Sequence, residues 1–184
     1  MRAHVRHHCC LHIVVDASPW GGGAILYRNG QPCEIFSLVW TMQDEQRTGA
    51  KIGDAGSQAI WEGLMMLRSL WCWMIPGSQG FVRIVGDAEG VLLALMKRSA
   101  RSPLLNTVVR EITLWLAKDF KSLETIHVWS EYNEWADALS RLRDPHKPAV
   151  IPEELRQFPH HVDAPQHWHK PLGGETARVA CTGS

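Results

Sequence analysis

Three short apolar runs near the start of the chain lie too close together for a helix to separate them. They cover residues 11–16, 24–27 and 34–39. Asn29-Gly30 stands between the last two, and this dipeptide is typical of a two-residue hairpin turn. Strands joined so tightly must run antiparallel, so the chain is predicted to begin with a three-stranded meander. This feature excludes an all-helical fold and an all-parallel sheet.

Later strand-like runs alternate with helical patterns. Residues 81–85 and 125–129 are predicted strands, and helices are predicted over 59–74, 89–97, 104–120 and 134–142. Residues 41–57 are polar and are predicted to form a loop. The element order β-β-β-α-β-α-α-β-α predicts an α/β protein with a mixed five-stranded sheet and flanking helices, because strands separated by helices return in parallel.

The composition changes at the end of the last predicted helix. Six of the ten prolines follow it, at 145, 148, 152, 159, 165 and 171. Proline removes a backbone donor and fixes φ, so dense prolines leave little room for regular structure. We therefore predict an N-terminal arm at 1–10, one domain at 11–143, and an extended or disordered tail at 144–184 with at most one helical turn near 153–157.

Charge and cysteine content narrow the function classes. Lys and Arg together number 19, as do Asp and Glu, so a protein that coats nucleic acid through a global positive field is disfavoured. The five cysteines have no paired spacing, which favours a reducing, intracellular environment without indicating which compartment. The longest apolar stretch, 59–75, contains Glu62 and Arg68, so no membrane span is predicted.

Four acidic residues occupy unusual positions. Asp16 and Asp87 end apolar strand-like runs, whereas Glu62 and Asp137 lie within helix-like runs. Two carboxylates about 4 Å apart repel by about 1 kcal/mol in water and about 4 kcal/mol at an effective dielectric constant of 20. A cluster of all four is therefore reasonable mainly if divalent cations neutralise it.

The local sequences around these acids resemble the type 1 ribonuclease H domain, in particular the domain that follows reverse transcriptase in retrotransposon and retrovirus-like polyproteins. The most specific match is Asn-Glu-Trp-Ala-Asp-Ala-Leu-Ser-Arg at 133–141, followed by Val-Asp-Ala-Ser-Pro-Trp-Gly-Gly-Gly-Ala at 15–24. Looser matches surround Asp87 and Glu62. The resemblance covers about residues 11–143, and four motifs in the right order on the right elements are far more specific than one.

The resemblance implies an endonuclease that cleaves the RNA strand of RNA–DNA hybrids. It implies that Asp16, Glu62, Asp87 and Asp137 are catalytic and bind two Mg²⁺ or Mn²⁺ ions. It also implies a retroelement origin and an upstream reverse transcriptase domain as a partner. Many relatives carry a histidine in the loop before the last helix, but that connection is Ser-Glu-Tyr at 130–132 here, and His127 is predicted to be a structural strand residue.

Eight residues are candidate nucleic-acid contacts. The glycine-rich run after the first strand would let the backbone approach a nucleic-acid strand closely. A basic cluster at the end of the second predicted helix would contact phosphates, although cations at a helix C-terminus also have a purely structural explanation. The candidates are Ser18, Trp20, Gly21, Gly22, Asn133, Lys97, Arg98 and Arg101.

Two other functions remain open at this point. A catalytically decayed ribonuclease H-fold module could serve as a connection or binding domain of a reverse transcriptase polyprotein. Another nuclease of the superfamily, such as an integrase-like or exonuclease domain, would share the fold. Retention of all four acids favours an active enzyme, and the motif at 133–141 favours ribonuclease H. Among the acids Glu62 has a rival in Asp54, and it could also be a solvated helix residue.

Overall fold

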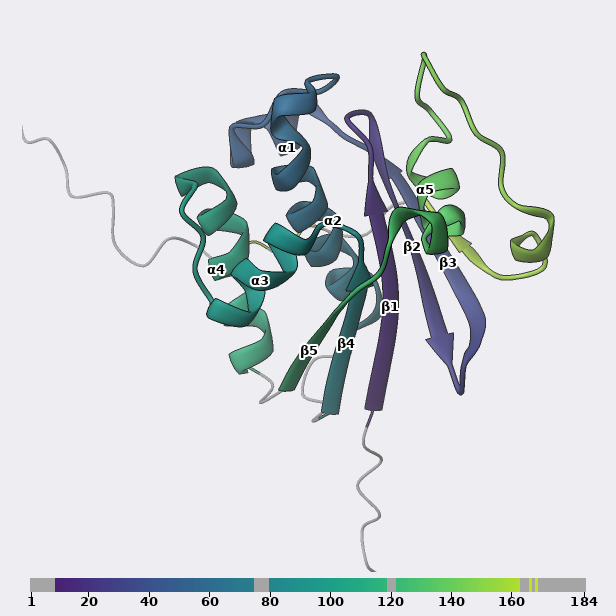
Figure 1. Ribbon diagram of the computed structural model, residues 1–184, viewed down its shortest axis with the longest axis horizontal. Helices are drawn as coiled ribbons and strands as arrows, with labels where there is room; N and C mark the ends of the chain where they lie inside the picture. The colour runs from purple at the N-terminus through teal and green to yellow at the C-terminus, as the bar shows by residue number, and fades with distance from the viewer. Residues whose placement is uncertain (1–8, 75–79, 119–121, 163–165, 167, 169–184) are drawn as a thin grey trace, which may run out of the picture.

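The computed structural model describes residues 9–74, 80–118, 122–162, 166 and 168 of the 184-residue chain. A six-stranded sheet with the order β5-β4-β1-β2-β3-β6 forms its centre (Figure 1). The strands are β1 Cys9–Ala17, β2 Gly21–Arg28, β3 Gln31–Val39, β4 Gly80–Gly86, β5 Ser122–His127 and β6 His160–His161.

The sheet is mixed, as predicted. β1, β2 and β3 pair antiparallel, whereas β4 pairs parallel with β1 and β5 pairs parallel with β4. Asn29 and Gly30 link β2 to β3 with φ angles of 52° and 78°. Two successive positive φ angles are those of a type I′ turn, whose twist matches that of the paired strands, and the predicted hairpin is confirmed.

Helices cover both faces of the sheet (Figure 1). α2 (Gln58–Trp73), α3 (Glu89–Lys97) and α4 (Pro103–Lys118) lie on one face together with α1 (Met42–Thr48). α5 (Glu134–Ser140) packs on the opposite face, against β1 and β2. The sheet thus separates α2, which carries Glu62, from α5, which carries Asp137.

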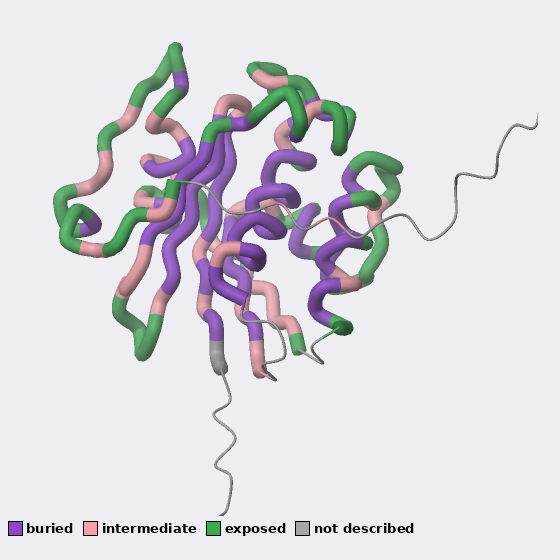
Figure 2. Tube along the Cα trace, turned by 180° about the vertical axis from the view of Figure 1, so that it is seen from behind, coloured by how far each residue is buried: buried purple, intermediate pink, exposed green. Residues whose placement is uncertain are grey.

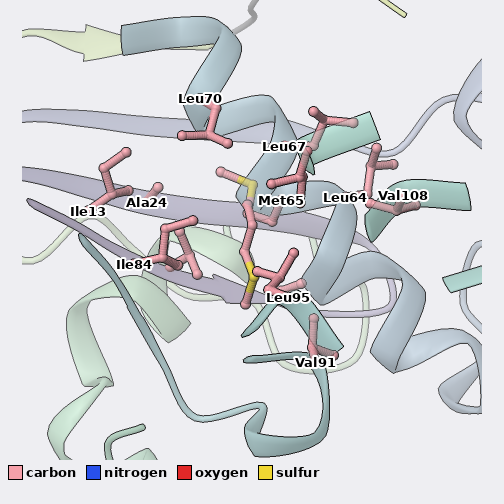
Figure 3. Packing of buried hydrophobic residues seen from close by; sticks show 14 of the residues in the cluster. Ile13, Ala24, Leu64, Met65, Leu67, Leu70, Ile84, Val91, Leu95 and Val108 are labelled. Atoms are coloured by element: carbon pink, nitrogen blue, oxygen red, sulfur yellow. The ribbon is translucent and has the colours of Figure 1, made fainter. Parts of the chain in front are cut away.

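Alternation along the strands creates two hydrophobic cores. Ala24 and Leu26 face the larger core, which lies between the sheet and α2–α4 (Figure 3). Ile25 points to the other face and packs with Ile35, Leu139 and Leu155. Successive strand side chains point to opposite faces, so one strand can serve both cores. Figure 2 shows the resulting concentration of buried residues in the central strands and α2.

The region 41–57 is not simply the predicted loop, because it contains α1. Thr41 and Asp44 form a reciprocal capping box: the Asp44 N–H donates to Thr41 Oγ1 (3.3 Å), and the Thr41 N–H donates to Asp44 Oδ2 (2.9 Å). Such a cap satisfies backbone donors that the first helical turn leaves free. The sequence does not indicate this helix, because its seven residues carry no apolar stripe.

The strand β5 begins three residues before its predicted start.

A sixth strand corrects the predicted number of five. β6 pairs with β3 through His160 and His161, and the Ile35 N–H donates to Pro159 O (2.9 Å). The expected helical turn is present as η3 (Glu153–Leu155), and Leu155 is fully buried in the smaller core. Within the described part of the segment after Arg143, Leu155 thus joins the smaller core and β6 joins the edge of the sheet, while most of the other residues are exposed. Residues 1–8, 163–165, 167 and 169–184 lie outside the described part.

Within the described ranges, the structure contains no helix of sufficient length and apolarity to cross a membrane.

Candidate functional site

Three of the four candidate acids meet at the carboxyl ends of two central strands. Asp16 is the penultimate residue of β1, and Asp87 directly follows β4, the parallel neighbour of β1. Glu62 extends from α2, which packs over β1. One carboxylate oxygen from each of these residues lies within 4.8 Å of the others. We call Asp16, Glu62 and Asp87 the acidic triad.

Asp16 is held by two residues at the ends of α5. Ser140 Oγ donates to Asp16 Oδ2 (2.7 Å), and Asn133 Nδ2 donates to Val15 O (3.0 Å) and to Asp16 Oδ1 (3.4 Å). The side chain is 5% exposed. Burial raises the pKa of Asp16 to about 7, the Ser140 hydrogen bond opposes this rise, and the charges of Asp137 and Asp87 add to it.

Glu62 presents one satisfied and one unsatisfied oxygen. Its Oε1 accepts hydrogen bonds from the Ala17 N–H (3.2 Å) and from Gln58 Nε2 (2.8 Å). Its Oε2 is buried and has no hydrogen-bond partner among the described residues. Burial raises the pKa of Glu62 well above its ordinary value, and the charges of Asp16 and Asp87 raise it further. A buried carboxylate oxygen without a donor needs a partner, and a cation meets that need.

Asp87 is more accessible. Ser130 Oγ, from the short 3₁₀ helix η2 (Ser130–Tyr132), donates to Asp87 Oδ2 (2.6 Å). The three carboxylates thus supply only oxygen ligands, the kind that Mg²⁺ and Mn²⁺ prefer. The residues present therefore fit a hard divalent cation.

Asp137 lies apart from the acidic triad. It belongs to α5 and is not among the described residues whose ligand atoms all lie within 4.8 Å of one another. Instead, Arg141 Nε donates to Asp137 Oδ1 (2.6 Å) one helical turn away. Its charge nevertheless raises the pKa of Asp16. The structure thus brings three predicted acids together and places the fourth nearby, paired with an arginine.

A groove leads away from the acidic triad. It has a volume of about 1120 Å³, and its lining runs from Glu62 and Asp87 along α3 to Lys97 and Arg101. Both basic side chains are exposed. Arg98 ends α3 with a φ of 54° and lines a separate hollow between α3, α4 and β5. Two of the three clustered basic residues therefore share a groove with the acids.

Four other candidate nucleic-acid contacts are buried. Ser18 Oγ donates to Ser140 O (2.8 Å), which links the end of β1 to the end of α5. A Cβ atom at Gly22 would lie 2.2 Å from Met65 Sδ, and one at Gly21 would lie 2.4 Å from Leu38 O. Asn133, described above, is 2% exposed. Burial gives these four residues a structural role: the two glycines leave room for atoms of α2, β3 and α5, and Ser18 and Asn133 hydrogen-bond across the site.

Trp20 is half-buried. Its ring lies beside Gly53, where an added Cβ atom would come within 2.9 Å of it, and makes an edge contact with His146 at 5.8 Å. His127 ends β5, so the prediction that it is a strand residue is confirmed.

Several residues at the site were not predicted. Ser140 and Arg141 follow Asp137 by three and four positions, which a helix places on the same face, so their spacing could have indicated them. Gln58 precedes Glu62 by four positions in α2, so the same kind of spacing could have indicated it, whereas Ser130 reaches Asp87 only through tertiary folding. Trp129 is 69% exposed, makes an edge contact with the His127 ring (5.4 Å), and directly precedes Ser130. No local pattern in the sequence distinguishes it from the other tryptophans.

Comparison with known proteins agrees with the fold. A sequence model of the reverse transcriptase-like family matches residues 21–142. LC11-RNase H1, isolated from compost, has a similar structure, with 15% identity, a TM-score of 0.51, and coverage of 71% of this chain and 90% of the other. RNase H1 from the halophilic archaeon Halobacterium salinarum NRC-1 has 17% identity, a TM-score of 0.48, and coverage of 71% and 94%. No curated protein matches the chain.

The family match covers more than half of the chain, and the mixed sheet with flanking helices agrees with the predicted ribonuclease H-like fold. The chain belongs to the reverse transcriptase-like family and folds as a ribonuclease H-type domain.

Proposed function

We propose that this protein is a divalent-metal-dependent endonuclease that hydrolyses the RNA strand of RNA–DNA hybrids. The observation that carries the proposal is the acidic triad with its unpartnered Glu62 Oε2, at one end of a groove whose other end carries Lys97 and Arg101. Three carboxylates this close without a compensating cation would repel one another strongly. The choice of a hybrid substrate rests on the ribonuclease H-type fold.

The acids have distinct parts in this proposal. Asp16, Glu62 and Asp87 hold the metal, and Asp137 completes its ligands from the margin of the site. When bound, two Mg²⁺ or Mn²⁺ ions would supply an activated water for attack on the phosphate and stabilise the departing 3′ oxygen. Ser140 and Asn133 orient Asp16, Gln58 orients Glu62, and Ser130 orients Asp87.

Nucleic acid binding depends on local features because the net charge is zero. Lys97 and Arg101 are positioned in the groove to contact phosphates beyond the reacting one. Trp129 offers an exposed ring beside the residue that orients Asp87, and aromatic rings stack on bases and sugars. Trp20 is less accessible, and Arg98 faces a different hollow, so both are candidates for peripheral contacts.

The family match also supports a retroelement origin and a reverse transcriptase domain as a partner of this one. Such a partner would supply additional contacts to the hybrid. A neutral domain with a short basic patch would benefit from them, because phosphate contacts provide much of the affinity for nucleic acids.

A cleavage assay on end-labelled substrates tests the proposal. With Mg²⁺ or Mn²⁺, the protein should cut the RNA strand of a hybrid and leave single-stranded RNA and double-stranded DNA intact, and chelation should abolish cleavage. Asp16→Asn and Glu62→Gln should reduce cleavage to background, whereas Glu154→Gln, at an exposed position far along the chain, should not. Hybrid binding without cleavage would instead identify a catalytically decayed binding module.

A further inference from the structure

Arg141 lies between two carboxylates, one partly exposed and one buried. Its Nε donates to Asp137 Oδ1 (2.6 Å), and its Nη1 lies 3.6 Å from Asp144 Oδ2. Asp137 is 41% exposed and belongs to the candidate metal ligands, whereas the Asp144 side chain is only 6% exposed. One guanidinium therefore contacts both the acidic site and the segment that follows α5.

The Asp144 carboxylate is fixed in place. Its Oδ1 accepts hydrogen bonds from the His146 N–H (2.8 Å) and the Lys147 N–H (3.1 Å), which leaves Oδ2 turned towards Arg141. These bonds and the charge of Arg141 lower the pKa of Asp144 in spite of its burial. A largely buried carboxylate whose first oxygen is already hydrogen-bonded is stabilised by a cation beside its second oxygen, and Arg141 Nη1 supplies that cation.

The main chain of Arg141 is also fixed by hydrogen bonds, whereas its side chain is partly exposed. Its N–H donates to Asp137 O (3.1 Å), and its carbonyl accepts from the Asp144 N–H (3.1 Å) and the Ala149 N–H (3.2 Å). The side chain is 31% exposed, so the guanidinium can move from one carboxylate to the other without crossing the hydrophobic core. Both carboxylates lie within its present reach.

We propose that Arg141 is a positioning residue that occupies Asp137 in the metal-free protein and passes to Asp144 when a divalent cation takes Asp137. The proposal rests on the proposed function, because it requires a metal at the acidic site. A guanidinium that is already paired with Asp137 competes with an incoming metal ion for the same carboxylate. Asp144 reduces the free-energy cost of metal binding because it accepts the displaced guanidinium. The segment after α5 thereby contributes to metal binding without supplying a ligand.

A purely structural pair predicts something different. If Arg141 and Asp137 only stabilise α5 as an i, i+4 pair, Arg141→Gln should lower the stability of the protein and leave metal affinity unchanged. If Arg141 acts only through its charge, Arg143→Gln should have the same effect, because Arg143 is exposed two residues away and carries the same charge. Neither alternative gives Asp144 a role that depends on Arg141.

Mn²⁺ affinity measured by electron paramagnetic resonance on the full chain, without nucleic acid, separates these cases. Arg141→Gln should bind Mn²⁺ about fivefold more tightly, the factor expected for removing a partly exposed ion pair. Asp144→Asn should bind it about threefold more weakly, within the same range. Asn retains an Oδ1 acceptor for the loop, so the fold around residue 144 should persist. In the Arg141→Gln background, Asp144→Asn should have no effect.

Three results would overturn the inference. Arg143→Gln could tighten binding as much as Arg141→Gln does, the two substitutions could act additively, or Arg141→Gln could leave the affinity unchanged. In each of these cases the proposed nuclease stands, because the wild type still binds metal. Failure of the wild type to bind Mn²⁺ at all would overturn this inference and the proposed metal-dependent function together.

Discussion

Replacing Asp16 with Asn should stabilise the metal-free protein, and the gain should depend on pH. Burial raises the pKa of this carboxyl from an ordinary 3.8 to about 7, and the charges of Asp137 and Asp87 add to the rise. The difference is about 3 pKa units, and each unit corresponds to about 1.4 kcal/mol. The folded state is therefore destabilised by up to about 4 kcal/mol once the carboxyl is ionised.

The sign follows from proton binding. Near pH 4 the carboxyl is largely protonated in the folded protein and about half protonated in the unfolded chain, so it costs little. As the pH rises to 7, the unfolded chain releases its proton while the folded state retains it, and the free energy of unfolding falls. Above pH 7 the folded state ionises as well, and the cost becomes constant.

Asn carries no charge at any pH and can keep the local hydrogen bonds. Its amide can donate to Ser140 Oγ, which then donates to Asp137 O, at 2.9 Å in the present structure. The substitution therefore removes the ionisation cost and gives one of the two amide hydrogens an acceptor in Ser140 Oγ. We expect the free energy of unfolding of Asp16→Asn to exceed that of the wild type by about 1 kcal/mol at pH 4.5 and by up to about 4 kcal/mol at pH 8.

Urea denaturation in the presence of EDTA measures this difference at the two pH values. Glu154→Gln, at an exposed position, serves as the matched control and should change stability equally little at both. Excess Mg²⁺ should then stabilise the wild type by about 2.7 kcal/mol at 100 times its dissociation constant, and Asp16→Asn by less. A stability gain that is the same at pH 4.5 and 8, or is absent at pH 8, would refute the reasoning.

Three further predictions concern the tail and the nucleic-acid surface. Leu155→Ala should lower the free energy of unfolding by about 2–5 kcal/mol in urea denaturation, because Leu155 is fully buried against the sheet; a change below about 1 kcal/mol would mean that the segment after Arg143 is dispensable, as the boundary predicted there implies. Trp129→Ala should weaken hybrid binding by about 1–3 kcal/mol in fluorescence anisotropy, and Trp129→Phe should restore part of the loss; equal losses would argue against stacking. Lys97→Gln with Arg101→Gln should reduce the slope of log affinity against log salt by about 2, whereas an unchanged slope would place phosphate contacts elsewhere.

The sequence by itself determined the central architecture. Asn29-Gly30 between two short apolar runs predicted the hairpin, because positive φ at both positions is easy for this pair, and the structure has that turn. The alternation of strands and helices predicted the mixed sheet, since connection length decides whether neighbouring strands are antiparallel or parallel. Local patterns are sufficient for both inferences.

Other elements left no periodic signal. α1 is short and polar and depends on a capping box, and β6 contributes only two residues whose pairing partner lies more than a hundred positions earlier. Leu155 becomes a core residue only because the chain returns across the sheet. Contacts between residues so distant in sequence cannot be found from the spacing of apolar residues, which reports local structure alone.

For the candidate site as well, some features follow from the sequence and others only from the tertiary structure. The sequence identified Asp16 and Asp87, since an acid that ends an apolar strand has few structural reasons to be there, and it identified Glu62 and Asp137 through the resemblance of their local sequences to ribonuclease H motifs. Tertiary structure alone decided that Asp16, Glu62 and Asp87 converge while Asp137 pairs with Arg141. It also decided that Asn133 and Ser18 are buried supports and that Lys97 and Arg101 share a groove with the acids. Residue type sets what a side chain can do, but distance and burial determine which of those interactions it makes.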